Sequence, residues 1–139
     1  KKSAVMAKNV SIKITDFFNI SSVCNYGISF GMMSHLNIGK ILILLDFLII
    51  AYLIYLISKE NNSFTKASIS LIIAGAIANV IDRSIHGCVF DFLDFHLKNY
   101  HWPSFNVADT FITIGAINTS MIDIKNKITN KKNNKKKKK

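Results

Sequence analysis

Apolar residues gather in three long stretches of the chain, and this pattern predicts three membrane-spanning helices. The clearest stretch, residues 41–57, reads ILILLDFLIIAYLIYLI, and its flanking residues extend it to the roughly 20 that cross a bilayer core. A second stretch covers about residues 67–81, and a third covers about residues 107–124. The pattern therefore predicts an all-α membrane protein, built as a helical transmembrane bundle with three spans.

Asp46 is the one charged residue inside the first predicted span. A polar side chain at this depth either faces the interior of the bundle, or bonds to a neighbouring helix close to the membrane surface. Both interpretations stay open, and neither gives Asp46 a catalytic role.

The connections between the spans differ in their polar pattern. Residues 14–30 alternate short apolar pieces with Asn, Ser and Gly, which is typical of short strands and turns. Residues 58–66 form a short polar turn, whereas residues 84–105 form a longer link rich in aromatic residues and His. Aromatic residues in segments of intermediate polarity suit a membrane surface. We therefore expect residues 14–30 to form a small β-like region beside the membrane.

Charge sets the orientation of the predicted bundle. Nine of the 18 Lys and Arg residues lie in the last segment, residues 125–139, and the 58–66 turn adds Lys59 and Lys66. By the positive-inside rule, the turn and the tail are cytoplasmic, while residues 14–30 and the aromatic link face outward. Three spans then place the N-terminus outside, so we expect that a first helix is missing.

The same pattern predicts one membrane-embedded domain over residues 1–124 and a basic cytoplasmic tail over residues 125–139. A lysine-rich tail can also bind nucleic acid. No fold that reads bases accompanies the tail, so we expect membrane lipids and no nucleic acid among the partners.

Cysteine and histidine give no sign of a metal site. The two cysteines, Cys24 and Cys88, have no metal-binding spacing, and we interpret each as a small buried apolar residue in preference to a disulfide partner or nucleophile. His86, His96 and His101 form no HxxxH or HExxH motif, so we expect no metal. The chain also lacks GxSxG, which leaves serine-based catalysis unsupported.

Polar residues cluster where the second and third spans should meet. Asn79 and Asp82 lie three apart, so they share one face of a helix, and Arg83 follows them. Asn106 is suited to cap the third span, and Asp109 falls in its first turn, where the helix dipole stabilises a carboxylate. Each group alone is typical of a helix end. Because charges at membrane depth are costly, the cluster indicates a functional site.

Asp91 and Asp94 lie among apolar neighbours in the segment VFDFLDF. Desolvation raises the pKa of a carboxyl group, and so does a second carboxylate nearby. Two carboxylates that share one proton can act together, one as base towards water and the other as acid. The residues alone do not choose which of Asp82, Asp91, Asp94 and Asp109 meet. They predict a membrane-embedded carboxylate site that faces outward.

The most specific pattern is a series of four segments: NYGISFG (25–31), GAIANVIDR (75–83), VFDFLDF (89–95) and FNVADTFITIG (105–115). In this order they resemble the motifs of the lipoprotein signal peptidase family, also called type II signal peptidases. The resemblance implies a multi-pass aspartic endopeptidase of the bacterial inner membrane, with its site towards the periplasm and no cofactor. Its substrate would be a prolipoprotein, cleaved just before the cysteine that carries diacylglyceryl.

The resemblance also implies four spans and a small extracytoplasmic β-like cradle, so the first helix is expected to be absent from this chain. Carried over residue by residue, it makes Asp91 and Asp109 the catalytic pair. Asp91 matches the aspartate of a V-x-D-F element, and Asp109 matches the aspartate of an F-N-x-A-D element. Asp94 becomes the weaker candidate.

Five further residues match supporting positions of the family. The N-x-x-D-R element, which orients the site and contacts the substrate, corresponds to Asn79, Asp82 and Arg83. Asn106 matches the asparagine beside the second catalytic aspartate. Asn25 matches the asparagine of an N-x-G element in the substrate cradle.

Two other functions fit the residues. A non-enzymatic membrane carrier subunit would also place carboxylates such as Asp82 and Asp109 within the bundle. A basic-tailed anchor would bind anionic lipid or nucleic acid through residues 125–139. Loss of prolipoprotein processing on replacement of the predicted catalytic pair would separate the peptidase from both.

Overall fold

The computed structural model describes residues 11–27 and 39–136. Residues 28–31 of the NYGISFG motif and the last three lysines of the tail lie outside these ranges, as does the end of the expected 14–30 strand region. Two strands come first along the chain, followed by two helices, two more strands and one long helix.

Three helices form the body of the molecule. They are α1, Gly39–Lys59; α2, Ser63–His86; and α3, Val107–Lys136. α2 begins where the Asn62 side chain accepts hydrogen bonds from the backbone N–H groups of Phe64 and Thr65, an N-cap. It ends at Gly87, whose φ of 80° closes the last turn. Both α1 and α2 extend into the 58–66 segment, so the polar turn is shorter than predicted.

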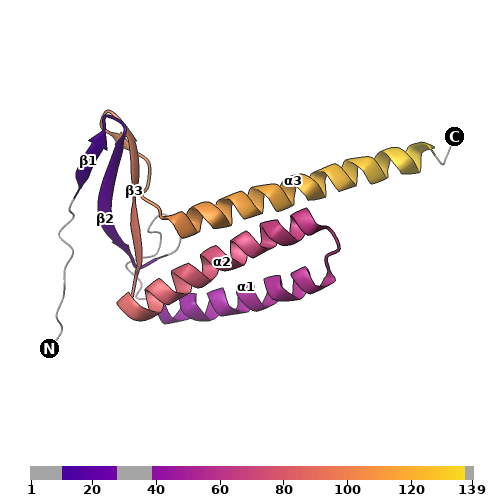
Figure 1. Ribbon diagram of the computed structural model, residues 1–139, viewed down its shortest axis with the longest axis horizontal. Coiled ribbons are helices and arrows are strands. Elements are labelled where there is room, and N and C mark those ends of the chain that lie inside the picture. The colour runs from indigo at the N-terminus through magenta and orange to yellow at the C-terminus, as the bar shows by residue number, and fades with distance from the viewer. Residues whose placement is uncertain (1–10, 28–38, 137–139) are drawn as a thin grey trace.

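A small antiparallel sheet stands at one end of the helices (Figure 1). Its strands, in their spatial order, are β1, Ile12–Thr15; β2, Phe18–Asn25; β3, Val89–Leu97; and β4, Tyr100–His101. The strands expected near residues 14–30 are confirmed, within the described residues. β3 and β4 lie in the 84–105 link, where no strand was expected. Buried aspartates stand in β3 at positions that an apolar residue usually fills, and they hide its strand pattern.

Two helices within the described residues, α1 and α2, are long and apolar enough to cross a membrane. Large apolar side chains of α1, such as Leu44 and Leu48, are exposed, so α1 is not the core helix of a soluble domain. α3 does not reach the same apolarity, because Asp109, Asn118 and Asp123 interrupt its first five turns. The prediction of a helical membrane protein with a small sheet is confirmed, but the third span is not.

The two ends of the molecule differ in charge. The turn between α1 and α2, flanked by Lys59 and Lys66, lies at the end away from the sheet, and α3 runs past it (Figure 1). α3 stays helical through Lys136, so it continues well beyond the predicted end of the third span at residue 124. Positive charge thus gathers at the end opposite the sheet, which is the arrangement that the positive-inside rule requires.

α2 and α3 approach so closely that two glycines leave no room for a side chain. A Cβ atom on Gly75 would overlap the carbonyl oxygen of Ala108, and one on Gly115 would lie 2.5 Å from the carbonyl oxygen of Ser68. Small residues allow helices to pack this closely in membranes. Since Ala108 precedes Asp109, the Gly75 contact fixes where the first turn of α3 stands against α2.

Replacement of Gly75 by alanine should therefore force α2 and α3 apart. Overpacking costs about 1–3 kcal/mol, which exceeds the ~1 kcal/mol that alanine gains over glycine inside a helix. We expect Gly75→Ala to lower the melting temperature measured in detergent. The matched control is Gly39→Ala, because among residues 11–27 and 39–136 a Cβ there meets the Gly87 carbonyl oxygen alone, at 3.9 Å. Equal melting temperatures for the two variants would contradict the close contact.

Candidate active site

A β-bulge in β3 buries both Asp91 and Asp94. The backbone N–H groups of Phe92 and Leu93 both donate to the carbonyl oxygen of Phe105, at 3.0 and 2.8 Å. Two residues of β3 thus oppose one residue, which shifts the alternation of the strand. In a regular strand, residues three apart face opposite sides. The bulge explains why the two aspartates are 3% and 7% exposed although three residues separate them.

Asp91 accepts a hydrogen bond on each carboxylate oxygen. Nδ2 of Asn25 donates to Oδ2 at 2.9 Å, and Nδ2 of Asn106 donates to Oδ1 at 2.8 Å. Burial raises the pKa of Asp91, the two amide donors lower it, and the charge of Asp109 raises it again, while Arg83 lowers it. The balance leaves the pKa of Asp91 above the ordinary value for an aspartate.

Asp109 is bound to its own helix cap and to α2. Its backbone N–H donates to Oδ1 of Asn106 at 2.9 Å, which confirms the predicted N-cap. The backbone N–H of Asn106 donates in return to Oδ2 of Asp109 at 3.3 Å, as in a capping box. Nδ2 of Asn79 donates to Oδ1 of Asp109 at 2.9 Å, and Oδ1 of Asn79 accepts from Nδ2 of Asn106 at 3.3 Å. Two asparagines therefore join Asp109 and Asp91 in one hydrogen-bond network.

Both carboxylates open onto one cavity of about 570 Å³. Its polar lining comes from the sheet, the link and all three helices: Asn25, Asp46, Asn79, Arg83, Asp91, Ser104, Asp109, Thr110 and Thr113. The rest of the lining is apolar or aromatic: Leu42, Ala76, Val89, Trp102, Phe105, Ile112 and Ile114. A largely apolar cavity with a few convergent polar groups is the usual form of a binding site.

Arg83 is buried and joins α1, α2 and the end of β2. Its Nη1 donates to Oδ2 of Asp46 at 2.8 Å, and its Nη2 donates to the carbonyl oxygen of Gly27 at 3.1 Å. Asp46 therefore faces the interior of the bundle and bonds to a neighbouring helix, so the two interpretations of Asp46 both hold. A buried arginine without a partner would be costly, and this pairing supplies one.

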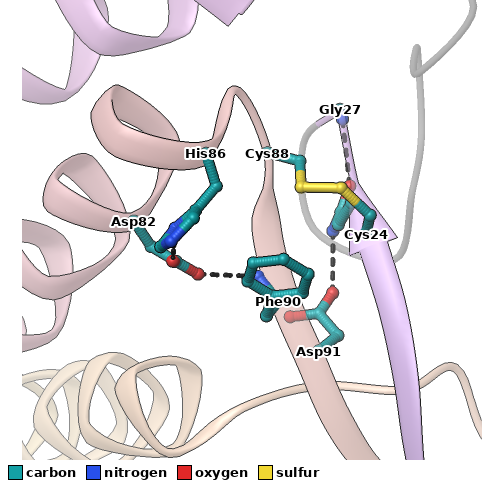
Figure 2. Close-up of a disulfide and its surroundings, with 8 residues drawn as sticks. Cys24, Gly27, Asp82, His86, Cys88, Phe90 and Asp91 are labelled. Carbon is teal, nitrogen blue, oxygen red and sulfur yellow. Dashed lines mark hydrogen bonds and ion pairs between the residues drawn. A yellow bond between two sulfur atoms is a disulfide. The ribbon is translucent and has the colours of Figure 1, made fainter. Parts of the chain in front are cut away.

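Asp82 is not among the residues that line the cavity, and its contacts are with α2 and β3. Its Oδ2 accepts from the backbone N–H of Phe90 at 2.7 Å, and its Oδ1 lies 2.6 Å from Nδ1 of His86 (Figure 2). The first contact fastens the start of β3 to the end of α2. Asp82 thus supports the strand that carries Asp91 and does not join the pair of carboxylates.

Asp94 also stands apart from the cavity. Nδ2 of Asn19 donates to its Oδ2 at 3.1 Å, and Nδ1 of His101 lies 2.9 Å from its Oδ1. Burial alone would raise the pKa of Asp94, but the contacts with His101 and Asn19 outweigh burial and hold the pKa below the usual value. Of the four aspartates left open by the sequence, Asp91 and Asp109 are the two that share a cavity.

The interpretation of the two cysteines as unpaired residues was wrong. Cys24 and Cys88 form a disulfide that joins the end of β2 to the start of β3 (Figure 2). The bond could have been expected from the predicted topology, because that topology put both cysteines on the outward side of the membrane. Disulfides persist in oxidising compartments such as the bacterial periplasm.

The groups gathered in the cavity suit acid–base chemistry. Within residues 11–27 and 39–136, no three His, Cys, Asp or Glu side chains are arranged to hold a metal ion. The cavity does offer two carboxylates, one of them with a raised pKa. Such a pair can share one proton and can exchange it with a substrate.

Comparison with known proteins identifies the family. The sequence model of the family described as Signal peptidase (SPase) II matches residues 1–125. The chain belongs to this family. It is 45% identical over 108 residues to the lipoprotein signal peptidase of Rickettsia akari, an alignment that covers 76% of this chain and 55% of that protein.

Further relatives and solved structures agree with this membership. The lipoprotein signal peptidase of Thermodesulfovibrio yellowstonii is 44% identical over 106 residues, which cover 76% of this chain and 70% of that protein. A bacterial membrane enzyme solved by the in meso method at 2.3 Å resolution is 32% identical, with a TM-score of 0.78 over 88% of this chain and 78% of that one. The chain spans about half the length of the Rickettsia relatives that it matches.

Asp94 should make the stability of the protein depend on pH in one direction. Its pKa is lower in the folded chain than in the unfolded chain, where it is about 3.9. Its contribution to stability is therefore complete above the unfolded-state pKa, and it is lost as the pH falls through the folded-state pKa. Between about pH 6 and about pH 3, we expect the wild type to lose more free energy of unfolding than Asp94→Asn. Equal losses in chemical denaturation would show that Asp94 is not stabilised by His101 and Asn19.

Proposed function

We propose that this chain is a membrane aspartic endopeptidase that removes the signal peptide from diacylglyceryl-modified prolipoproteins, cleaving just before the lipidated cysteine. One observation carries the proposal: Asp91 and Asp109 open onto the same cavity and are joined through Asn79 and Asn106. Membership of the signal peptidase II family supports the substrate class. Relatives of the chain bear the name lipoprotein signal peptidase.

In the proposed reaction, one carboxylate of the pair removes a proton from a water molecule, which attacks the scissile carbonyl carbon. The other carboxyl group donates its proton to the carbonyl oxygen as the tetrahedral intermediate forms. When the C–N bond breaks, the departing amine takes up a proton from the pair. In this reaction the two carboxylates share the proton, which belongs to the pair and not to either residue.

The surrounding polar residues would orient the pair. Asn106 and Asn79 hold the two carboxylates relative to each other, and Asn25 holds Asp91 from the side of the sheet. Catalytic groups must be kept close to their productive geometry by bonded neighbours, because small displacements are costly to rate. We therefore assign these asparagines a positioning role.

The apolar part of the cavity suits the lipid chains of the substrate. Leu42 of α1, Ala76 of α2 and Ile112 of α3 supply apolar wall near the carboxylates. Burial of lipid methylene groups against such a wall is favourable, by about 0.8 kcal/mol each. We propose that the diacylglyceryl group lies in the membrane beside these helices, with the peptide bond at the carboxylate pair.

We further propose that α3 is the third span, that residues 1–124 form the peptidase domain and that residues 125–139 form a cytoplasmic tail. The sheet would then face the periplasm across the bacterial inner membrane. The support is the separation of the sheet from Lys59, Lys66 and the lysines of α3 (Figure 1). The periplasmic side is also the side where a disulfide would persist.

Substitution of the pair tests the proposal directly. In Asp91→Asn and Asp109→Asn, the amide can neither remove a proton from water nor donate one as an acid. We expect each variant to cleave a diacylglyceryl-modified prolipoprotein in liposomes at least about 100-fold more slowly than the wild type.

Two aspartates of the same chain serve as controls. Asp94→Asn changes a buried aspartate outside the cavity, and Asp123→Asn changes an exposed one on α3. Both controls should retain cleavage at a temperature where they are folded. Cleavage at the wild-type rate by Asp91→Asn or Asp109→Asn would refute the catalytic pair. Cleavage by both would leave the carrier-subunit function as the better account of the carboxylates.

A further inference from the structure

The Cys24–Cys88 disulfide lies next to the residues that hold Asp91. Cys24 immediately precedes Asn25, the residue whose amide donates to Asp91, and Cys88 lies just before β3, which carries Asp91 (Figure 2). The two Cα atoms are 5.6 Å apart, and 64 positions separate the cysteines along the chain. The disulfide therefore joins β2 to β3 at the end of the sheet that carries Asn25.

The Cys88 side of the bond is fixed to α2. The backbone N–H of Gly87 donates to the carbonyl oxygen of Arg83 at 2.9 Å, which closes the helix one residue before Cys88. Two residues after Cys88, the backbone N–H of Phe90 donates to Oδ2 of Asp82 at 2.7 Å. Cys88 itself is 0% exposed. It is therefore a buried anchor held on both sides.

The Cys24 side of the bond belongs to the last residues of β2. Asn25 pairs with Val89 at the end of the β2–β3 ladder, where strands open most easily. Beyond it, the backbone N–H of Gly27 donates to Oδ1 of Asn25 at 2.9 Å, and the Gly27 carbonyl oxygen accepts from Nη2 of Arg83. Asn25 thus stands between two anchors, the disulfide before it and the Arg83 contact after it.

We propose that the Cys24–Cys88 disulfide is a positioning element of the active site, which holds the Asn25 amide against Asp91, and that its reduction slows peptide cleavage. The proposal rests on the proposed peptidase function. Without the disulfide, the end of β2 can separate from β3, and Asn25 donates to Asp91 for a smaller fraction of the time.

A change in the Asn25 contact has a specific electrostatic consequence. The bond from Asn25 is one of the interactions that lower the pKa of Asp91, so its weakening raises that pKa further. Among the described residues, the charged groups that act on Asp91 are Asp109 of α3 and Arg83 of α2, and Asp46 of α1 lines the same cavity paired with Arg83. None of these three lies on β2, so the Asn25 bond is the hydrogen bond to Asp91 that opening the end of β2 weakens directly.

Reduction by a dithiol proceeds by two exchanges. A dithiol thiolate attacks the Sγ atom of Cys24, which is partly exposed, and the Cys88 thiolate leaves. The second thiol of the reagent then displaces Cys24 and closes the reagent into its own disulfide. Two electrons and two protons pass from the dithiol to the cystine, which yields two cysteine thiols. The chain holds only these two cysteines, so the reagent has one target.

The test compares oxidised and dithiothreitol-reduced wild type in prolipoprotein cleavage, as kcat and KM across a pH series. We expect reduction to lower kcat about fivefold or more, with a smaller change in KM, and to move the acidic limb of the kcat profile to higher pH. Reoxidation should restore both. The double variant Cys24→Ser/Cys88→Ser should show the reduced profile and should not respond to the dithiol.

Asn25→Ala provides the matched comparison. If the disulfide acts through Asn25, the acidic limb in Asn25→Ala is already shifted, and reduction moves it no further. A lower melting temperature with unchanged kcat and an unmoved limb would show a purely structural bond and would overturn the proposal. Failure of the oxidised wild type to cleave at all would instead refute the proposed peptidase function.

Discussion

The close contact between α2 and α3 is the constraint on which the site depends. At Gly75 the two backbones meet without room for a Cβ, which sets the first turn of α3 beside the middle of α2. Asn79 lies one turn further along α2, and its amide therefore reaches Asp109 at 2.9 Å. Asn106, the N-cap of α3, then donates to Asp91 on β3 and so connects it to Asp109. A separation wider by one methyl group would break this chain of contacts.

The choice of asparagine as the connecting residue has an electrostatic reason. A buried carboxylate is costly unless its oxygens are bonded, and amide donors satisfy them without supplying a full charge. An arginine or lysine at the same place would hold each carboxylate ionised and would prevent the exchange of a proton. Arg83, the buried cation nearby, is bound instead to Asp46 and to the Gly27 backbone. The two carboxylates thus accept hydrogen bonds from neutral amides inside a largely apolar cavity.

The local features of the fold could be predicted from the sequence. The apolar runs identify α1 and α2, and Asn106 is recognisable as the N-cap at which α3 begins. The long-range features could not be predicted, because they depend on residues that meet only after folding. The β-bulge of β3 requires the carbonyl oxygen of Phe105 as a shared acceptor, and the Arg83–Asp46 pair joins two helices. Four aspartates are equal candidates by sequence position and neighbours, and only the family resemblance favours Asp91 and Asp109.

The central claim is that Asp91 and Asp109 form one coupled acid–base pair. It is tested most directly by infrared titration of the Asp91 carboxyl band, assigned by its loss in Asp91→Asn, in the wild type and in Asp109→Asn. Because the charge of Asp109 helps to raise the pKa of Asp91, its removal should move the Asp91 midpoint to lower pH. An unchanged midpoint would mean that the two carboxylates do not act on each other, and it would contradict the account.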